Sequence, residues 1–184
     1  MKVRIIEKAL FGAIILFTSI SLSAQQRMSI DAGVIRQMRT KVNGLNLSAF
    51  YHFTEKLSGG LEINRFFPIT KKENGEELTL SAWDFDLNFH YTLPLAGHIK
   101  WYPLTGFSHT SETEKIKTDV SEGTVKERFW SFNTGAGLLW ETGHLIPHAE
   151  YSFTWGHINQ QFLLVGLSYE IELGHHKKHH VITE

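Results

Sequence analysis

A histidine and a serine two positions apart are the residues of this sequence most suited to covalent chemistry. They lie in the segment His109-Thr110-Ser111-Glu112, and Glu122 and Glu127 follow downstream. A serine hydroxyl becomes a nucleophile when a histidine accepts its proton and a carboxylate orients that histidine. Residues two apart share one face of a β-strand, so an extended segment would place His109 beside Ser111. The same residues are also typical of a solvated loop.

A second set of residues could perform acid–base catalysis. Its members occupy polar positions of the segments described below, and they are Asp31, His52, Glu62, Asp84, Asp86, His90, Lys100, His148, Glu150 and Glu170. Paired carboxylates can donate and accept a proton. Charged groups enclosed in a protein also need hydrogen-bonding partners, so the set is equally typical of a structural network. We favour the structural interpretation.

The run His175-His176-Lys177-Lys178-His179-His180 could bind a divalent metal through neutral imidazoles. Its lysines would repel a cation, and nothing rigid fixes the ligands. We therefore expect residues 174–184 to form a polar, His/Lys-rich periplasmic tail. From the sequence we assign no catalytic residue, no cofactor and no metal ligand.

The elements that must position these side chains are β-strands. From Trp83 to Leu93 every odd position is large and apolar and every even one is polar, which sorts the residues onto two faces of a strand. Similar alternation predicts strands near 27–38, 45–56, 60–69, 78–93, 98–113, 125–142, 146–156 and 160–173. Eight strands joined as hairpins predict an all-β fold, an antiparallel up-and-down barrel over residues 25–173.

The N-terminus predicts export. Lys2, Arg4 and Lys8 precede an apolar run over 9–22 that ends in small and polar residues, as in a signal peptide over residues 1–24. The run is shorter than the roughly 17–25 residues of a membrane-spanning helix. The net charge of −1 gives no basic face for nucleic acid, and the absence of cysteine excludes a disulfide framework.

The connections alternate in length. Tight turns are expected around Lys56–Gly60, Pro94–Gly97 and Gly143–Leu145, whereas Lys71–Glu77 and Glu112–Arg128 are long and charged. Outer-membrane barrels combine short periplasmic turns with longer extracellular loops. We expect the third loop, Ser111–Val125, to project as a hairpin beyond the membrane.

Two features favour a membrane barrel over a soluble one. The aromatic side chains gather at two levels, an outer one with Trp83, Trp130 and Trp155 and an inner one with Trp101, Trp140, Tyr91 and Tyr169. The ten residues from Trp130 to Trp140 span roughly 26 Å at a tilt of about 40°, close to the apolar band of about 25 Å. Glycines share the polar face with long side chains, as a narrow, filled lumen requires: Gly135, Gly137 and Gly166.

Two contacts in this barrel can be anticipated. A tight turn at Pro94–Gly97 would place Lys100 opposite His90, and Tyr102 opposite Asn88. Alternation would point Arg65 at lipid, where it costs about 2–4 kcal/mol at the midplane. A bulge before Pro68 could turn its side chain away.

Three stretches resemble the small OmpX/OmpA-type barrels, the "outer membrane protein β-barrel domain" group. They are Tyr102-Pro103-Leu104-Thr105-Gly106-Phe107, Asn133–Gly137 with Pro147–Tyr151, and Gly166–Ile171. The resemblance implies an outer-membrane location, surrounding lipid and lipopolysaccharide, assembly by the barrel-assembly machinery, and no reaction. Residues after Leu173 are a departure, since such barrels often end on an aromatic residue.

The first motif also resembles another family. An outer-membrane lipid A deacylase family uses His-x-Ser and a downstream Glu, and His109, Ser111 and Glu122 or Glu127 could fill those roles; Glu112 stands where that family has Asn. We expect instead a small non-porin outer-membrane protein with a structural or adhesin-like role. Its third loop would contact a surface protein partner, and the deacylase is the alternative.

Overall fold

The computed structural model describes residues 27–73, 76–117 and 122–173. The expected signal peptide, 1–24, and the expected tail, 174–184, lie outside these ranges. Within them the chain forms ten strands: β1 Arg27–Gln37, β2 Val42–His52, β3 Leu57–Phe66, β4 Ile69–Glu73, β5 Glu76–Tyr91, β6 Leu93–Ala96, β7 Ile99–Lys117, β8 Glu122–Trp140, β9 Leu145–Gly156 and β10 Gln160–Glu172. Among the described residues no helix is long and apolar enough to cross a membrane.

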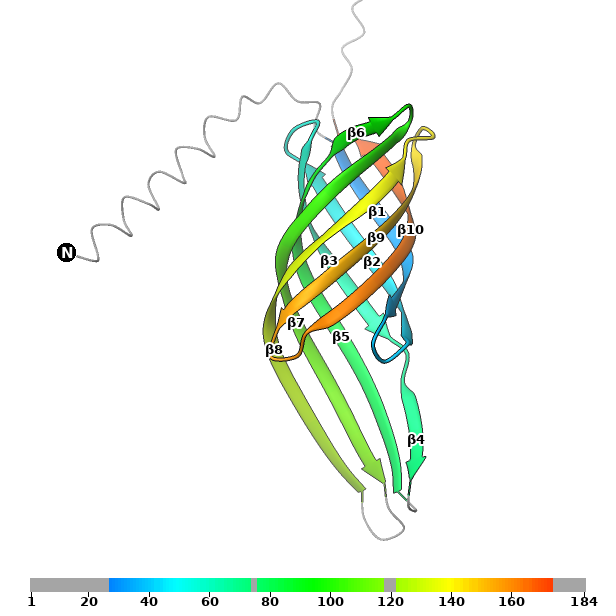
Figure 1. Ribbon diagram of the computed structural model, residues 1–184, viewed down its shortest axis with the longest axis vertical. Coiled ribbons are helices and arrows are strands. Elements are labelled where there is room, and N and C mark those ends of the chain that lie inside the picture. The colour runs from blue at the N-terminus through cyan, green and yellow to red at the C-terminus, as the bar shows by residue number, and fades with distance from the viewer. Residues whose placement is uncertain (1–26, 74–75, 118–121, 174–184) are drawn as a thin grey trace, which may run out of the picture.

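Eight of these strands close into an antiparallel barrel (Figure 1). Around the ring the order is β1, β2, β3, β5, β7, β8, β9 and β10, and β10 pairs with β1 to close it. The short strands β4 and β6 pair only with β5 and β7 and lengthen two hairpins. The predicted all-β, up-and-down, eight-stranded barrel is therefore confirmed.

The two faces of the barrel wall carry opposite kinds of residue, with apolar side chains outside and polar side chains in the lumen. Leu87 and its neighbour Asn88 are 41% and 3% exposed, because one side chain points outward and the other into the lumen. The outward side chains of the barrel are mostly large and apolar, whereas most of the buried residues are polar. Such a surface is stable only against hydrocarbon, so the barrel spans a membrane. The exposed rings of Trp130 and Trp140 lie at the two ends of this apolar face of β8.

The third strand differs from the predicted 60–69. It starts at Leu57 and ends at Phe66, and Pro68, which lacks an N–H, separates it from β4. The expected turn at Lys56–Gly60 lies earlier, at 53–56, and Gly60 is inside the strand. A Cβ on Gly60 would clash with the Ala49 carbonyl oxygen. This glycine is needed for close packing inside the barrel and not for a turn.

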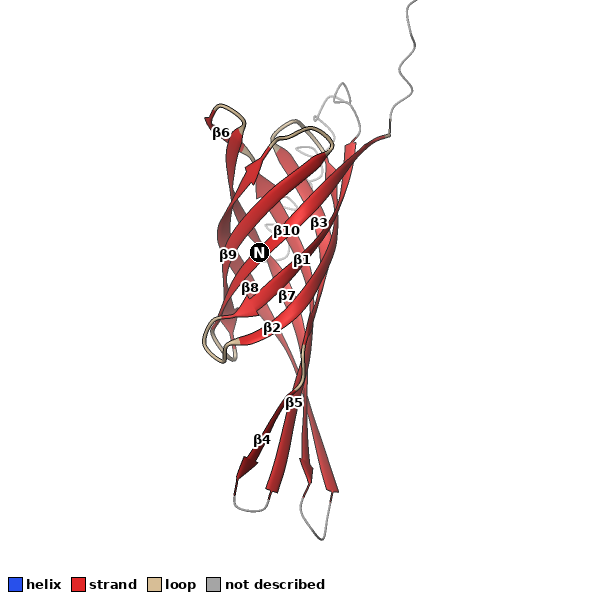
Figure 2. Ribbon diagram, turned by 90° about the vertical axis from the view of Figure 1, so that its right-hand side faces the viewer, coloured by secondary structure: helices blue, strands red, loops and turns tan. Residues whose placement is uncertain are grey.

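The two charged connections are strands over most of their length, so the strands that they join are longer than predicted. β5, β7 and β8 continue beyond the other barrel strands, and with β4 they form a sheet that projects from one end of the barrel (Figure 2). Lys117 of β7 still pairs with Glu122 of β8. The third loop therefore projects as a regular hairpin, as the sequence predicted. Long hairpins of outer-membrane barrels face outward, and in keeping with that expectation we call this part, β4 with residues 76–81, 112–117 and 122–130, the extracellular sheet.

Candidate functional site

A hydrogen-bonded network fills the middle of the lumen. Asn88 Nδ2 donates to Glu62 Oε1 at 2.6 Å, and Asn46 Nδ2 donates to the other oxygen of this carboxylate at 3.2 Å. Asn64 Nδ2 donates to Asp86 Oδ2 at 2.8 Å. These bonds join the neighbouring strands β2, β3 and β5 along the inner wall, as expected for an eight-stranded barrel whose lumen is filled by its own side chains.

The partners of the buried carboxylates are amides and hydroxyls. In the part of the chain that the structure describes, no lysine or arginine is buried. Asn133 instead links the network to β8, donating to Asn88 Oδ1 at 3.3 Å and accepting from Thr154 Oγ1 at 3.0 Å. The expected structural network is present, and in the middle of the lumen it consists of neutral donors around carboxyl groups. Glu170, nearer the end with the short turns, forms an ion pair with Arg27 at 3.4 Å.

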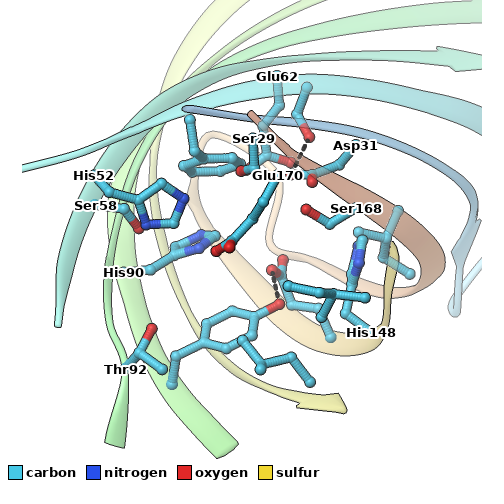
Figure 3. A pocket seen from close by; sticks show the side chains of 17 residues that line it. Ser29, Asp31, His52, Ser58, Glu62, His90, Thr92, His148, Ser168 and Glu170 are labelled. Atoms are coloured by element: carbon cyan, nitrogen blue, oxygen red, sulfur yellow. Dashed lines mark hydrogen bonds between the residues drawn. The ribbon is translucent and has the colours of Figure 1, made fainter. Parts of the chain in front are cut away.

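A small cavity of about 70 Å³ lies in the lumen near the end with the short turns. The side chains of His52, His90 and Glu170 point into it (Figure 3). The His90 ring stacks on Tyr102 with centroids 4.6 Å apart, and the Tyr102 hydroxyl donates to Glu150 Oε2 at 3.2 Å. This volume holds a few water molecules and no organic substrate. No group of three or more His, Asp or Glu among the described residues could hold a metal ion.

Lys100 does not belong to this lumen set. It lies opposite Pro94 of β6, not opposite His90, and its ammonium group donates to Glu141 in a half-exposed ion pair. His90 lies opposite Leu104, because β6 and a bulge at Pro94/Ala96 lengthen the hairpin. The expected pairing of Lys100 with His90, and of Tyr102 with Asn88, was therefore wrong.

His109 and Ser111 share the outer face of β7, as their spacing predicted. The His109 ring packs against Trp130 with centroids 4.7 Å apart, and Ser111 lies between Trp83 and Arg128 in the strand register. The pair therefore lies at the outer aromatic level of the barrel wall.

The carboxylates needed for a triad are elsewhere. Glu112 points to the opposite face of β7, where Gln160 Nε2 donates to it at 3.4 Å, and Glu127 lies directly opposite Glu112 on β8. Glu122 lies opposite Lys117, far along the extracellular sheet. His109 Nδ1 has no hydrogen-bond partner among the described residues. The arrangement does not bring a carboxylate to His109, as a Ser-His-Glu triad requires.

Arg65 points outward, and no bulge turns it inward. The pairing of β3 with β5 is continuous up to Arg65 opposite Trp83. Its guanidinium carbon lies 4.5 Å from the centre of the Trp83 ring. A cation on a tryptophan face at the outer aromatic level keeps its charge near water, so the midplane cost does not apply.

A larger cavity, of about 530 Å³, opens at the other end of the lumen, and we call it the outer-mouth cavity. Its walls come from β1, β2, β3, β4, β5, β7 and β10 and from the connections between β1 and β2 and between β9 and β10. Phe66, Leu80 and Ala82 are among its apolar lining residues, and Asp84 and Glu112 are its acids. The sequence reasoning missed this cavity. The apolar residues at both parities in Leu80–Trp83 were the available signal, because they break the polar lumen pattern.

The acids of this cavity differ in depth. Asp84 is 4% exposed and accepts a hydrogen bond from Thr110, yet its Oδ1 has no partner among the described residues. Glu112 lies above the outer aromatic level, where burial raises the pKa of its carboxyl above the usual value and Glu127 adds to this. The hydrogen bond from Gln160 acts in the opposite direction.

The extracellular sheet has a free edge along β8. Residues 122–140 of β8 lie opposite β7, whereas the pairing with β9 begins only at Ser131. Residues 122–130 therefore have a backbone neighbour on one side only within the described chain. β4 likewise pairs only with β5.

Solved structures share this fold at low sequence identity. The attachment invasion locus protein Ail of Yersinia pestis, in complex with the heparin analogue sucrose octasulfate, has a TM-score of 0.61 and 14% identity over 80% of this chain and 99% of Ail. The N-terminal β-barrel domain of Pseudomonas aeruginosa OprF has a TM-score of 0.64 and 18% identity over 81% of this chain and 100% of that domain. A major outer membrane protein of Thermus thermophilus has a TM-score of 0.65 and 9% identity over 79% of this chain and 99% of that one.

The sequence matches no protein-family model and no curated protein. The structural likeness therefore concerns the fold alone. The apolar outer face shows that this barrel spans a membrane, and the likeness gives the chain the fold of the small outer-membrane β-barrels.

Proposed function

We propose that the chain is a non-porin surface-interaction protein that binds a partner chain at the free edge of its extracellular sheet. The observation that carries this proposal is the unpaired edge of β8 over residues 122–130. An exposed strand edge offers a row of backbone N–H and C=O groups, and an extended partner segment can add to it as a further strand.

The side chains along this edge favour binding of a specific partner. Lys126, Glu127 and Arg128 are exposed and alternate in charge. Charged residues on an edge strand oppose indiscriminate pairing with hydrophobic strands. A partner strand of complementary charge would meet less opposition, which makes the edge specific.

The role that we propose involves no reaction and no channel. No carboxylate is placed to orient His109, and the lumen is filled by a side-chain network. Ail, which shares the fold, is named for attachment and invasion; an adhesin-like role of that kind is our proposal for this chain. Surrounding lipid, including lipopolysaccharide, and the barrel-assembly machinery are the other partners that we expect.

A trimmed hairpin tests the proposal. Thr110 and Phe129 lie directly opposite each other, so residues 111–128, which include most of the free edge of β8, can be replaced by a two-residue Asn-Gly turn. Bacteria producing this variant should attach to epithelial monolayers and matrix-coated plates no better than bacteria without the protein. Heat-dependent gel migration of the variant checks that the barrel is still assembled.

A second variant tests whether attachment depends on the backbone of the edge or on the charges of its lysine side chains. Lys115→Gln with Lys126→Gln keeps both strands and should retain most of the attachment, because strand addition uses backbone hydrogen bonds. Full attachment by the trimmed but assembled protein would refute the proposal.

A further inference from the structure

The outer-mouth cavity combines an apolar wall with the buried acid Asp84. Neither feature belongs to the free edge of β8, where we propose that a partner chain binds. Next to the cavity, Ile35, Phe66, Phe162 and Leu164 form a buried apolar cluster. The Phe66 and Phe162 rings lie 5.6 Å apart between their centres. Phe66 of this cluster also lines the cavity, so the cluster forms part of its apolar wall.

The size and lining of the cavity suit a small organic molecule. Its volume of about 530 Å³ lies within the range of about 300–1,000 Å³ that is usual for ligand pockets. Val42, Phe67 and Ile69 add apolar surface from three further positions of the wall. Apolar walls with a few converging polar groups are the usual composition of such a site.

The polar group at the base of the cavity, Asp84, favours a ligand that donates a hydrogen bond. Asp84 is almost completely buried, and its Oδ1 is without a hydrogen-bond partner among the described residues. A buried acceptor without a partner costs free energy, which a ligand that donates a hydrogen bond would recover. Glu112 lines the same cavity, so a positively charged donor would meet two carboxyl groups.

We propose that the outer-mouth cavity binds a small amphipathic molecule that carries an ammonium group. Its apolar body packs against Phe66 and Leu80, and its ammonium group donates to Asp84. The exposed cations Arg39 and Lys71 also line the cavity and would repel an ammonium held beside them. The charged end of the ligand therefore points inward. This site is independent of the partner that we propose for the sheet edge.

Three indole compounds of nearly equal size test the charge preference. Tryptamine carries an ammonium group, tryptophol a neutral hydroxyl, and indole-3-propionate a carboxylate. Binding to the full chain in lipid nanodiscs would be measured by titration calorimetry, with empty nanodiscs as the reference for partitioning into lipid. Tryptamine should bind about tenfold or more tightly than tryptophol, because a hydrogen bond to a charged group is worth about 1.5–3 kcal/mol.

Indole-3-propionate should bind most weakly. Equal affinity for the three compounds, tighter binding of the carboxylate, or no saturable binding would each overturn the proposal. The comparison uses the unaltered protein, so it does not depend on the folding of any variant.

Two variants at adjacent lumen-facing positions of β5 test whether Asp84 is the acid that holds the ammonium group. Asp84→Asn retains an acceptor for Thr110 and should remove the preference for tryptamine over tryptophol. Asp86→Asn is the matched control, because Asp86 lies on the same face but does not line the cavity. An unchanged preference in Asp84→Asn would show that this acid does not hold the ammonium group.

A third variant tests the location. Ala82→Leu adds bulk to the cavity wall and should weaken the binding of tryptamine and tryptophol together. If Ala82→Leu bound both compounds as well as the unaltered protein, the site would have to lie elsewhere.

Discussion

Strands β5, β7 and β8 each pass through two environments, the membrane and the extracellular sheet. The polarity of their outward side chains and the pairing of the strands differ between the two. Inside the membrane every barrel strand has a neighbour on both sides, and the outward side chains are mostly apolar. In the extracellular sheet the outward side chains beyond Trp130 are polar, and β8 has lost its second neighbour. Hydrocarbon cannot hydrogen-bond a free strand edge, whereas water can. Closure is therefore required only at membrane depth.

The largest expected difference is in accessibility to protease. Trypsin added to intact cells should cleave at Lys115, Lys117 or Lys126, since these side chains are exposed in the extracellular sheet. The nicked barrel should still migrate as a folded species before boiling, because the cuts lie outside the closed ring. Protection of these sites together with cleavage at Lys56, in a short turn at the other end, would reverse the orientation of the barrel.

A newly introduced charge should separate the two regions energetically. Leu87→Arg places a guanidinium on the lipid-facing wall and should lower the free energy of unfolding by about 2–4 kcal/mol. Val125→Arg, exposed in the extracellular sheet and opposite Glu114, should change it by less than about 0.5 kcal/mol. Urea unfolding in lipid vesicles measures both. A harmless Leu87→Arg would mean that this face does not meet hydrocarbon.

Loss of one amide should reveal the importance of the lumen network. Asn88→Ala removes the donor to Glu62 and the acceptor for Asn133, and should cost about 1–3 kcal/mol. Asn43→Ala, at an exposed position of β2, is the control and should cost less than about 0.5 kcal/mol. Equal stability of the two variants in the same unfolding assay would argue against a network that depends on Asn88.

The smallest effect concerns pH at the junction of the two regions. The pKa of Glu112 is raised in the folded chain, so ionisation of this carboxyl disfavours the folded state. Relative to Glu112→Gln, the unaltered protein should lose stability as the pH rises from the usual glutamate pKa through the raised one. Above that window the difference should be constant. A gain in relative stability over the same window, measured by urea unfolding, would contradict the sign of this shift.

The sequence determined which face of each strand meets lipid. The alternation from Trp83 to Leu93 predicted an outward Leu87 and an inward Asn88, and both are found. The spacing of His109 and Ser111 likewise predicted a shared face. These predictions succeed because a strand has a side-chain period of two, so the pattern of residue types is enough to assign the faces.

Only the tertiary structure decided which residues meet across the barrel. Lys100 was expected opposite His90, but Leu104 occupies that position, four residues further along the strand and on the same face. A shift by an even number of residues leaves every face unchanged, so alternation cannot distinguish one such register from another. The bulge at β6, the packing around Gly60 and the outer-mouth cavity with Asp84 all depend on that register. They follow from how the strands are staggered around the closed ring, which is a property of the whole barrel and not of any one strand.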